Sequence, residues 1–252
     1  MSPMRNTFIA EIGYRQGGDL SVAKGIVVPE LCVPETDVVL TSVLLTWADI
    51  LAGPLATQST LPRVCMTNDL TVRLLGRPPA GDVDMRAAVL KSGRTTTFTE
   101  TWLCPAGDDA PFAVAHGTFV ASPRPQDVID LETLAGNRGT RTLESPLPDR
   151  LGVRVVEPGV AEVARRDDLL NPADTLQGGV VALLAEIATL SLAGGAVIAR
   201  ELDVRYLRAT RVGPARATAR AIGPDLVDVR VVDAGADDRL SAVAVVRTGP
   251  VE

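Results

Sequence analysis

The sequence has few of the residues that build nucleic-acid surfaces, metal sites or disulfide frameworks. Only 3% of its 252 residues are aromatic, lysine occurs only at positions 24 and 91, and the net charge is −6. Base-stacking platforms and basic stripes are therefore not expected. The cysteines, Cys32, Cys65 and Cys104, stand singly without a Cys-x-x-Cys spacing, and there is one histidine. This pattern predicts free thiols and no metal.

Long apolar runs are missing as well. The N-terminus has no apolar stretch of signal-peptide type, and no uninterrupted 18-residue apolar segment is present that would cross a bilayer. We therefore expect a cytoplasmic protein that binds neither membranes nor nucleic acid. The hydrophobic content of 46% is ample for a core, and the length suits one large domain or two ordinary ones.

The most informative segment is an apolar helix that carries a single acid. Between Val180 and Ala193 every residue is Val, Ala, Leu, Ile, Thr or Ser except Glu186. A helix that is apolar on all sides is buried, and a buried carboxylate is costly unless it is paired or has a function. Gly178 and Gly179 stand at the start of the helix, where free N–H groups and the helix dipole favour a developing negative charge. The segment therefore carries a candidate acid and a candidate oxyanion hole.

These two features cannot act on the same atom. Eight residues separate Gly178 from Glu186, and a helix rises about 1.5 Å per residue, so they lie roughly 12 Å apart. A second helix must complete each site. The segment from Leu40 to Pro54 is again apolar with one carboxylate, Asp49, and its Gly-Pro pair at 53–54 predicts the helix end.

The two helices belong to an internal repeat. Asp49 stands nine residues after Leu40, as Glu186 stands nine after Gln177. In both halves strand-like runs follow the helix in the same order, at 69–75, 83–90, 95–103 and 112–120, and at 201–207, 215–222, 226–232 and 240–248. This order predicts an α+β fold in which one helix lies on an antiparallel sheet, made twice.

The repeat also predicts the domain organisation. We expect an N-terminal unit at 1–122 and a C-terminal unit at 150–252. The segment 123–149 between them is rich in Pro, Asp, Arg and Gly, has weak apolar periodicity, and is predicted to be a linker across the surface.

The segment around Gly178 resembles the motif of the hotdog-fold acyl-CoA thioesterases, in the branch of phenylacetyl-CoA and Arthrobacter-type 4-hydroxybenzoyl-CoA thioesterases. Their signature is Asn-x-x-Gly-x-x-His-Gly-Gly, followed by Asp or Glu on the central helix. Asp174 replaces the first glycine here, and Gln177 replaces the histidine. The remaining matches are Asn171, Gly178, Gly179 and Glu186.

The resemblance implies a tandem double hotdog with two sites, each taking its N–H groups from one unit and its carboxylate from the other. The first site would join Gly178 and Gly179 to Asp49. Asn171 would hold the carbonyl or the water, and Gln177 would donate a hydrogen bond in place of the histidine.

The second site implied by the resemblance is the more degenerate one. It would join Glu186 to the N–H groups of Thr41 and Ser42, whose side chains crowd the place of the two glycines. Thr189, one turn after Glu186, would help to orient water. Arg73 and Arg205, at equivalent strand positions, are candidate contacts to coenzyme A phosphates, although a solvated surface arginine is the default.

The implied reaction is hydrolysis of an acyl-CoA thioester to the free acid and coenzyme A. The carboxylate would activate water or attack directly to form a mixed anhydride. Coenzyme A belongs to the substrate, so no metal and no separate cofactor is expected, and two chains would form a homodimer. His116 is remote from both helices, which disfavours hydratase chemistry. Two alternatives stay open: a non-catalytic acyl-CoA or acyl-chain binding protein, and a structural or assembly role.

Overall fold

The computed structural model describes residues 7–124, 127–128 and 141–251. Most of the predicted linker therefore lies outside the described residues. The N-terminal unit contains the short helix α1 and the long helix α2, and the C-terminal unit contains α5, preceded by the short α4. Their bounds are Thr7–Glu11 for α1, Thr41–Gln58 for α2, Leu147–Leu151 for α4 and Gly178–Ala193 for α5.

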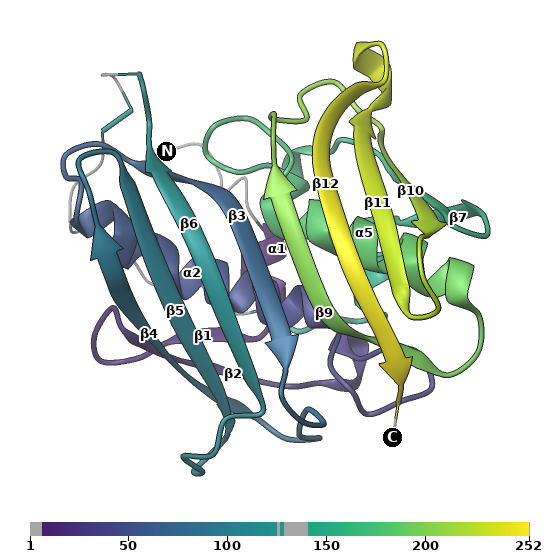
Figure 1. The fold of residues 1–252 in the computed structure, drawn as a ribbon, viewed down its shortest axis with the longest axis horizontal. Coiled ribbons are helices and arrows are strands. Elements are labelled where there is room, and N and C mark those ends of the chain that lie inside the picture. Colours follow the sequence, from purple (N-terminus) through teal and green to yellow (C-terminus); the bar gives the residue numbers. More distant parts are fainter. Residues whose placement is uncertain (1–6, 125–126, 129–140, 252) are drawn as a thin grey trace.

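Within the described residues the strands form a single twelve-stranded antiparallel sheet in the order β1-β2-β4-β5-β6-β3-β9-β12-β11-β10-β8-β7 (Figure 1). The first six are Tyr14–Gln16, Val22–Gly25, Cys65–Leu74, Val83–Ser92, Thr96–Pro105 and Ala113–Ala121. The second six are Arg154–Glu157, Val160–Val163, Val197–Tyr206, Ala215–Ala221, Leu226–Asp233 and Arg239–Pro250. The order in one half mirrors the order in the other, as the internal repeat predicts.

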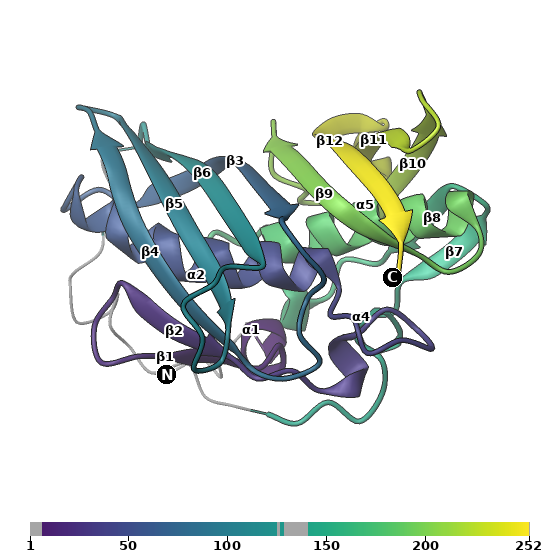
Figure 2. The ribbon, with the colours of Figure 1, turned by 60° about the horizontal axis from the view of Figure 1, so that its bottom comes forward.

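The two halves join through β3 and β9. These strands pair antiparallel from Asp69 opposite Arg205 to Arg73 opposite Glu201, which makes the two sheets continuous. Helices α2 and α5 contact each other and lie against one face of the sheet, whose ends curl around them (Figure 2). Each helix start is thereby brought near the middle of the other helix.

The core lies between the helices and the sheet. Strand residues alternate between buried apolar side chains that face the helices, such as Val72 and Val204, and polar side chains on the outer face, such as Arg73. The helices themselves have no polar face, which explains their position between sheet and neighbouring helix.

The predicted end of the first helix at Gly53 and Pro54 is wrong, because α2 continues to Gln58 with Pro54 inside it. A proline within a helix removes one N–H donor and costs stability. Here Pro54 and Ala56 are buried against the sheet, so packing of the extra turn offsets the lost hydrogen bond.

Candidate functional site

The two long helices start in equivalent backbone settings. Each follows a one-turn 3-10 helix, η1 at Pro29–Leu31 and η2 at Asp167–Leu169. The N–H group of Leu40 donates to Leu31 at 2.9 Å, and that of Gln177 donates to Leu169 at 2.9 Å. The repeat therefore extends to the loops that place the helix starts, and differences between the sites lie in their side chains.

Glu186 occupies the start of α2. Its two carboxylate oxygens accept hydrogen bonds from the backbone N–H groups of Thr41, at 3.0 Å, and Ser42, at 2.8 Å. Glu186 is 0% exposed, and both N–H donors belong to buried residues. Burial raises the pKa of Glu186, while the hydrogen bonds from Ser42 and Thr41 oppose that rise. The donors predicted to hold a substrate oxyanion are thus occupied by the carboxylate of the protein itself.

The hydroxyl of Thr189 is likewise engaged within the protein. It is buried, and its hydroxyl donates to the carbonyl of Ala185 on its own helix at 3.0 Å. The Thr41 hydroxyl donates to the carbonyl of Ala199 at 2.6 Å. The hydroxyl groups of Thr41 and Thr189 therefore bind backbone carbonyls, whereas the buried Ser42 hydroxyl has no partner among the described residues.

The start of α5 is arranged differently. Gln177 caps the helix, and its side-chain oxygen accepts the N–H group of Gly179. Gly178 is only half-buried, and its N–H group has no hydrogen-bond partner among the residues that the structure describes. One backbone donor is therefore left available at this helix start, where the helix dipole favours an anion.

Asp49 lies near this second helix start. It is half-buried, and one of its carboxylate oxygens accepts a hydrogen bond from the hydroxyl of Thr67, on β3, at 2.7 Å. Tyr206, at the end of β9, donates from its hydroxyl to the carbonyl of Gly178 at 3.1 Å. Burial and the negative charge of Asp49 raise the pKa of Tyr206 well above its ordinary value. Tyr206 therefore bonds to the helix start of its own unit and lies within the electrostatic reach of Asp49 from the other unit.

Asn171 stabilises the loop before α5. Its side-chain oxygen accepts the N–H groups of Ala173, at 2.9 Å, and Thr175, at 3.2 Å. That oxygen is therefore engaged within its own turn, and the predicted contact of Asn171 with a carbonyl or a water stays a prediction. Asp174, in the same loop, has a φ of 60°, the left-handed region that favours glycine. This backbone geometry explains why a glycine suits that position of the signature.

Thr67 and Tyr206 were missed by reasoning from the sequence. At the equivalent positions of the repeat stand Ala199 in place of Thr67 and Leu74 in place of Tyr206. A comparison of the two halves residue by residue shows that only the Asp49 side carries these hydroxyl groups. That difference is the sequence signal which distinguishes the two sites.

Arg73 and Arg205 lie on the outer face of the sheet, opposite the helices. Arg73 pairs with Glu201 at 2.9 Å, and Arg205 is 3.8 Å from Asp203. Both belong to the ladder of charges at the unit junction, and their contact with coenzyme A phosphates stays a prediction.

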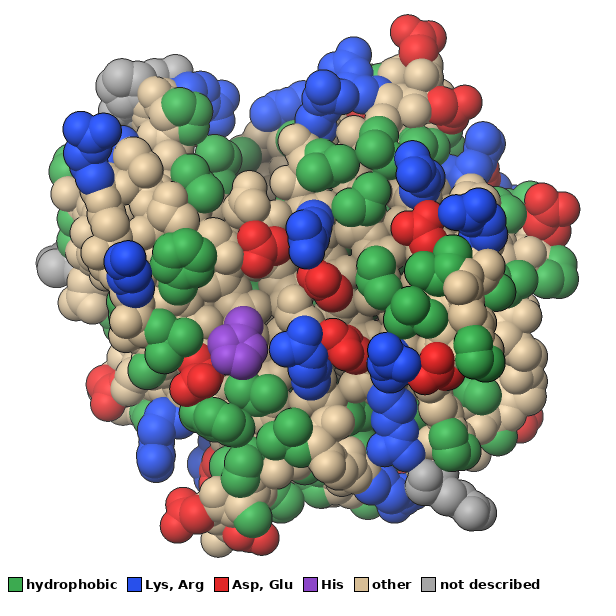
Figure 3. Space-filling model, viewed as in Figure 1, with side chains coloured by type: hydrophobic (Ala, Val, Ile, Leu, Met, Phe, Trp, Pro, Cys, Tyr) green, Lys and Arg blue, Asp and Glu red, His purple; other side chains and the backbone are tan. Residues whose placement is uncertain are grey.

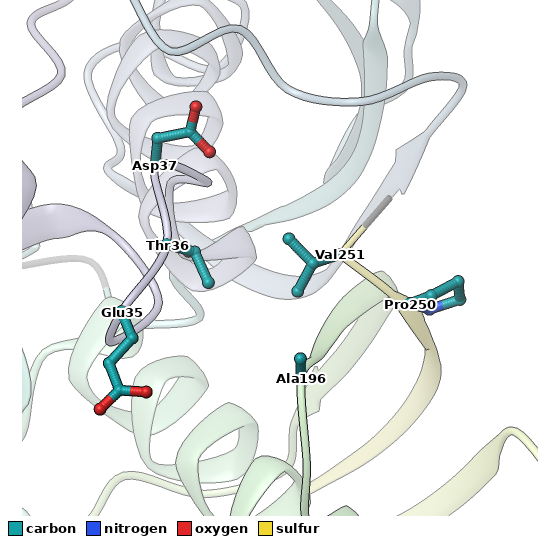
Figure 4. A pocket seen from close by; sticks show the side chains of 6 residues that line it. All are labelled: Glu35, Thr36, Asp37, Ala196, Pro250 and Val251. Carbon is teal, nitrogen blue, oxygen red and sulfur yellow. The ribbon is translucent and has the colours of Figure 1, made fainter.

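A pocket of about 630 Å³ lies at the end of the molecule that corresponds, in the repeat, to the mouth of the Glu186 site. Figure 4 shows the loop before α2 facing the end of β12 across it. Its lining residues are Glu35, Thr36, Asp37, Ala196, Pro250 and Val251. Of the two carboxylates in this lining, Asp37 pairs with Arg77 at 2.6 Å.

Neither a metal site nor a membrane span is found in the part of the chain that the structure describes. Its His, Cys, Asp and Glu residues form no group of three or more that would hold a metal ion. None of its helices combines the length and the apolar character needed to cross a bilayer.

Comparison with known proteins gives matches in structure alone: no family model and no curated protein matches the sequence. An acyl-ACP thioesterase from Bacteroides thetaiotaomicron is 11% identical, with a TM-score of 0.65 over 90% of this chain and 97% of that one. The acyl-CoA thioesterase II TesB2 of Mycobacterium marinum is 14% identical, with a TM-score of 0.58 over 95% and 96%.

A third similar structure is described by its fold. It is a conserved protein of unknown function with a hot dog fold from Alicyclobacillus acidocaldarius, 14% identical, with a TM-score of 0.57 over 96% of this chain and 97% of that one. The resemblance seen in the sequence is thus confirmed at the level of the fold. The chain is an α+β protein of the double hotdog fold, in which each unit wraps an antiparallel sheet on one long central helix.

Proposed function

We propose that this protein hydrolyses acyl-CoA thioesters at the Asp49 site. The observation that carries the proposal is the difference between the two helix starts. At α2 the N–H groups of Thr41 and Ser42 are bonded to Glu186, whereas at α5 the N–H group of Gly178 has no partner among the described residues and the half-buried Asp49 lies on the facing helix. Thioesterases among the similar structures support the same reaction class.

In the proposed reaction the thioester carbonyl oxygen binds at the N–H group of Gly178. Asp49, oriented by the hydroxyl of Thr67, removes a proton from a water molecule that attacks the carbonyl carbon. Negative charge develops on the carbonyl oxygen, where the backbone N–H group and the helix dipole stabilise it. The carbon–sulfur bond then breaks, the thiolate leaves with a proton from Asp49, and the free acid remains.

Direct attack by Asp49 on the carbonyl carbon is the other route. It would expel the thiolate and form a mixed anhydride, which water then hydrolyses. A single turnover in ¹⁸O-water that leaves the label in Asp49 establishes this route, because only hydrolysis of the anhydride at the enzyme acyl carbon places the label there.

Glu186 has a different role in this proposal. It caps α2 and holds the two helices together, so only one of the two sites predicted from the sequence is catalytic. Coenzyme A enters as part of the substrate, and no separate cofactor is required. A homodimer and a cytoplasmic location remain predictions.

A non-catalytic acyl-CoA binding protein is the second candidate. It is favoured by one observation: the side-chain oxygen of Gln177 occupies the N–H group of Gly179, which halves the number of donors available to an oxyanion. Such a protein would bind acyl-CoA through the same helix start and release it unchanged.

Thiol release from a panel of acyl-CoAs separates the two candidates. We expect wild-type turnover, a loss of at least about 100-fold in Asp49→Asn, and retained turnover in Glu186→Gln once the variant is shown to be folded. Equal turnover in wild type and Asp49→Asn would refute the proposed site. Binding of acyl-CoA without any thiol release by the wild type would establish the second candidate.

A further inference from the structure

Three arginines, Arg165, Arg208 and Arg211, flank the helix start at Gly178. We refer to them as the arginine rim. The loop 207–213, which carries two of them, runs beside the loop that precedes α5. The N–H group of Leu176 donates to the carbonyl of Thr210 at 3.0 Å, only two residues before Gly178.

A hydrogen bond and an ion pair connect the rim to the loop that precedes α5. Arg211 donates from its guanidinium to the carbonyl of Ala173 at 3.3 Å, and Arg165 pairs with Asp174 at 3.2 Å. The carboxylate of Asp233 accepts the N–H groups of residues 211, 212 and 213 at 2.8, 3.1 and 2.7 Å. These contacts fix the backbone that presents the rim, so an incoming ligand does not have to order it.

Several hydrogen-bond donors around the rim lack an acceptor. Arg208 is exposed, and its guanidinium makes no hydrogen bond or ion pair to any residue described by the structure. The Nε atom of Arg165 and the hydroxyl of Thr210 are buried with no hydrogen-bond partner in the described parts of the chain, and Thr210 is only 2% exposed. Buried donors without a partner are costly and rare in folded proteins, so they indicate a ligand or water that accepts from them.

The positive charge of the rim contrasts with the protein as a whole, whose net charge is −6. Figure 3 shows Lys and Arg side chains gathered at the edge of the molecule above the end of β9. Tyr206, which ends β9, donates to Gly178. The basic region is therefore next to the open helix start.

The repeat within the chain provides an internal comparison. At the positions equivalent to Arg165, Arg208 and Arg211, the N-terminal unit has Val27, Gly76 and Pro79. The corresponding mouth is the pocket of about 630 Å³ lined by Glu35 and Asp37 (Figure 4). The equivalent loop of the N-terminal unit carries one arginine, Arg77, which is paired with Asp37 at 2.6 Å, whereas Arg208 beside the open site pairs with none of the described residues.

The rim lies within reach of a pantetheine arm that starts at the helix start. Four residues separate Gly178 from Asp174, which pairs with Arg165, so the chain between them spans at most about 14 Å. A pantetheine arm has about as many chain atoms between its sulfur and its terminal oxygen as four residues of polypeptide, and it therefore has a similar reach. A thioester held at Gly178 would place the phosphate at the far end of the arm beside the rim.

We propose that the arginine rim binds the phosphate groups at the end of a pantetheine arm and so selects phosphorylated acyl carriers. Guanidinium groups suit this task, because they bind phosphate oxygens in a bidentate manner and stay charged at all working pH values. The proposal rests on the thioester site at Gly178 and Asp49, and it adds the group that distinguishes the substrate from a simple thioester.

The test compares three thioesters that share one acyl group: acyl-CoA, S-acyl-4′-phosphopantetheine and S-acyl-pantetheine, which has no phosphate. The variant is Arg208→Gln/Arg211→Gln. The control is Arg86→Gln, which removes an exposed arginine without a described partner from the N-terminal unit. We expect kcat/KM for acyl-CoA to fall about ten-fold or more in the rim variant, mainly through KM, and to be unchanged for S-acyl-pantetheine.

The three substrates also locate the phosphate. An equal loss for S-acyl-4′-phosphopantetheine assigns the rim to the phosphate shared by coenzyme A and carrier proteins, whereas a loss confined to acyl-CoA assigns it to the nucleotide end. A loss of equal size for S-acyl-pantetheine, or a loss of the same size in Arg86→Gln, would overturn the proposal.

Equilibrium binding of coenzyme A tests the rim without any turnover. We expect coenzyme A to bind the wild type more tightly than the rim variant and pantetheine to bind both alike, and the difference should shrink as salt is added. A wild type that hydrolyses no thioester but shows this pattern would refute the hydrolase and leave the rim intact. Equal affinity of wild type and variant for coenzyme A would refute the rim.

Discussion

The carboxylate of Glu186 accepts the backbone N–H group of Ser42 at 2.8 Å, although the two residues are 144 positions apart in the chain. This contact gives the acid a structural use, because it neutralises the start of α2 and ties the helices of the two units together. The equivalent acid, Asp49, has a side chain shorter by one methylene and bonds to Thr67 in its own unit. The same position in the repeat therefore binds the helix start of the other unit in one half and a strand hydroxyl of its own unit in the other.

The first prediction concerns Glu186. Glu186→Gln keeps one acceptor oxygen but turns an NH₂ group toward the second backbone donor, and we expect it to lower the free energy of unfolding by about 1–3 kcal/mol. Glu186→Ala should cost more, because it also leaves a cavity. Urea unfolding measures both. Glu201→Gln, in the exposed charge ladder, is the control and should change stability by less than about 1 kcal/mol.

The pKa of Glu186 gives this prediction a dependence on pH. Burial raises the pKa of Glu186 in the folded protein above its value in the unfolded chain. The stability that Glu186 contributes is therefore fully present below the unfolded pKa and is lost as the pH rises through the folded pKa. Glu186→Gln removes that dependence. A stability difference between wild type and variant that is independent of pH would contradict the assignment.

The second prediction concerns Tyr206. Tyr206→Phe removes the hydrogen bond to the carbonyl of Gly178 and loosens the helix start, so we expect kcat for a thioester to fall about ten-fold with a stability loss of only about 1 kcal/mol. Because the pKa of Tyr206 lies well above its ordinary value, the phenol stays protonated near neutral pH. The pH profiles of wild type and variant should then have the same shape.

The control for Tyr206 comes from the repeat. Leu74→Tyr places a phenol at the equivalent position beside the closed site, where it should not change turnover. Tyr206→Phe with full activity would show that the hydroxyl neither positions the helix start nor contributes to the reaction.

The architecture could be predicted from the sequence because periodicity and repetition determine it. The apolar helix from Gly178 to Ala193 and the run of strands after it are found within a few residues of their predicted bounds. The helix around Asp49 was predicted too short, because the rule that proline ends a helix considers the backbone near the proline and not the packing of the helix. The burial of Pro54 against the sheet, which outweighs that rule, is a property of the tertiary structure.

The site was only partly predictable for a similar reason. The cross-unit pairing of Glu186 with Thr41 and Ser42 was expected, but whether a carboxylate reaches the N–H groups or stops short of them depends on one methylene and on the separation of the helices. No sequence pattern records that distance. The hydroxyl groups of Thr67 and Tyr206 come from strands, where a polar residue on either face of the sheet gives the same local signal.

The third prediction concerns the ion pairs at Asp168. Arg150 and Arg166 each contact its carboxylate at 2.9 Å, and their hydrogen bonds lower the pKa of Asp168 to about 2. Since the folded pKa is below the unfolded value of about 3.9, the contribution of Asp168 to stability is present above pH 4 and is lost between about pH 4 and pH 2. Asp168→Asn should cost about 1 kcal/mol at pH 7.

Urea unfolding at several pH values tests this prediction. The stability difference between wild type and Asp168→Asn should shrink toward zero as the pH approaches 2. Asp225→Asn, which breaks an exposed ion pair with Arg247, controls for the loss of a surface charge. A difference that is as large at pH 2 as at pH 7 would mean that the asparagine acts through packing and not through charge.

The fourth prediction tests the contact between the helices at Gly179. A methyl group on this residue would lie 2.7 Å from the Cγ2 atom of Thr46, within α2, so Gly179→Ala should destabilise the protein by about 1–3 kcal/mol. Gly178→Ala is milder, since its methyl group would meet the ring of Tyr206 at 3.3 Å.

Thr46→Ala supplies the second arm of a double-mutant cycle at this contact, since it removes the two nearest atoms that a methyl group on Gly179 would meet and leaves the side-chain oxygen of Gln177 at 2.9 Å. Because the Thr46 hydroxyl bonds, among the described residues, to the carbonyl of Ser42 one turn earlier and to no other group, its loss alone should cost about 1 kcal/mol or less. The double variant Thr46→Ala/Gly179→Ala should therefore be more stable than Gly179→Ala, a coupling that distant sites do not show. Additive effects would mean that the glycine is needed for the backbone of the helix start and not for the approach of α2.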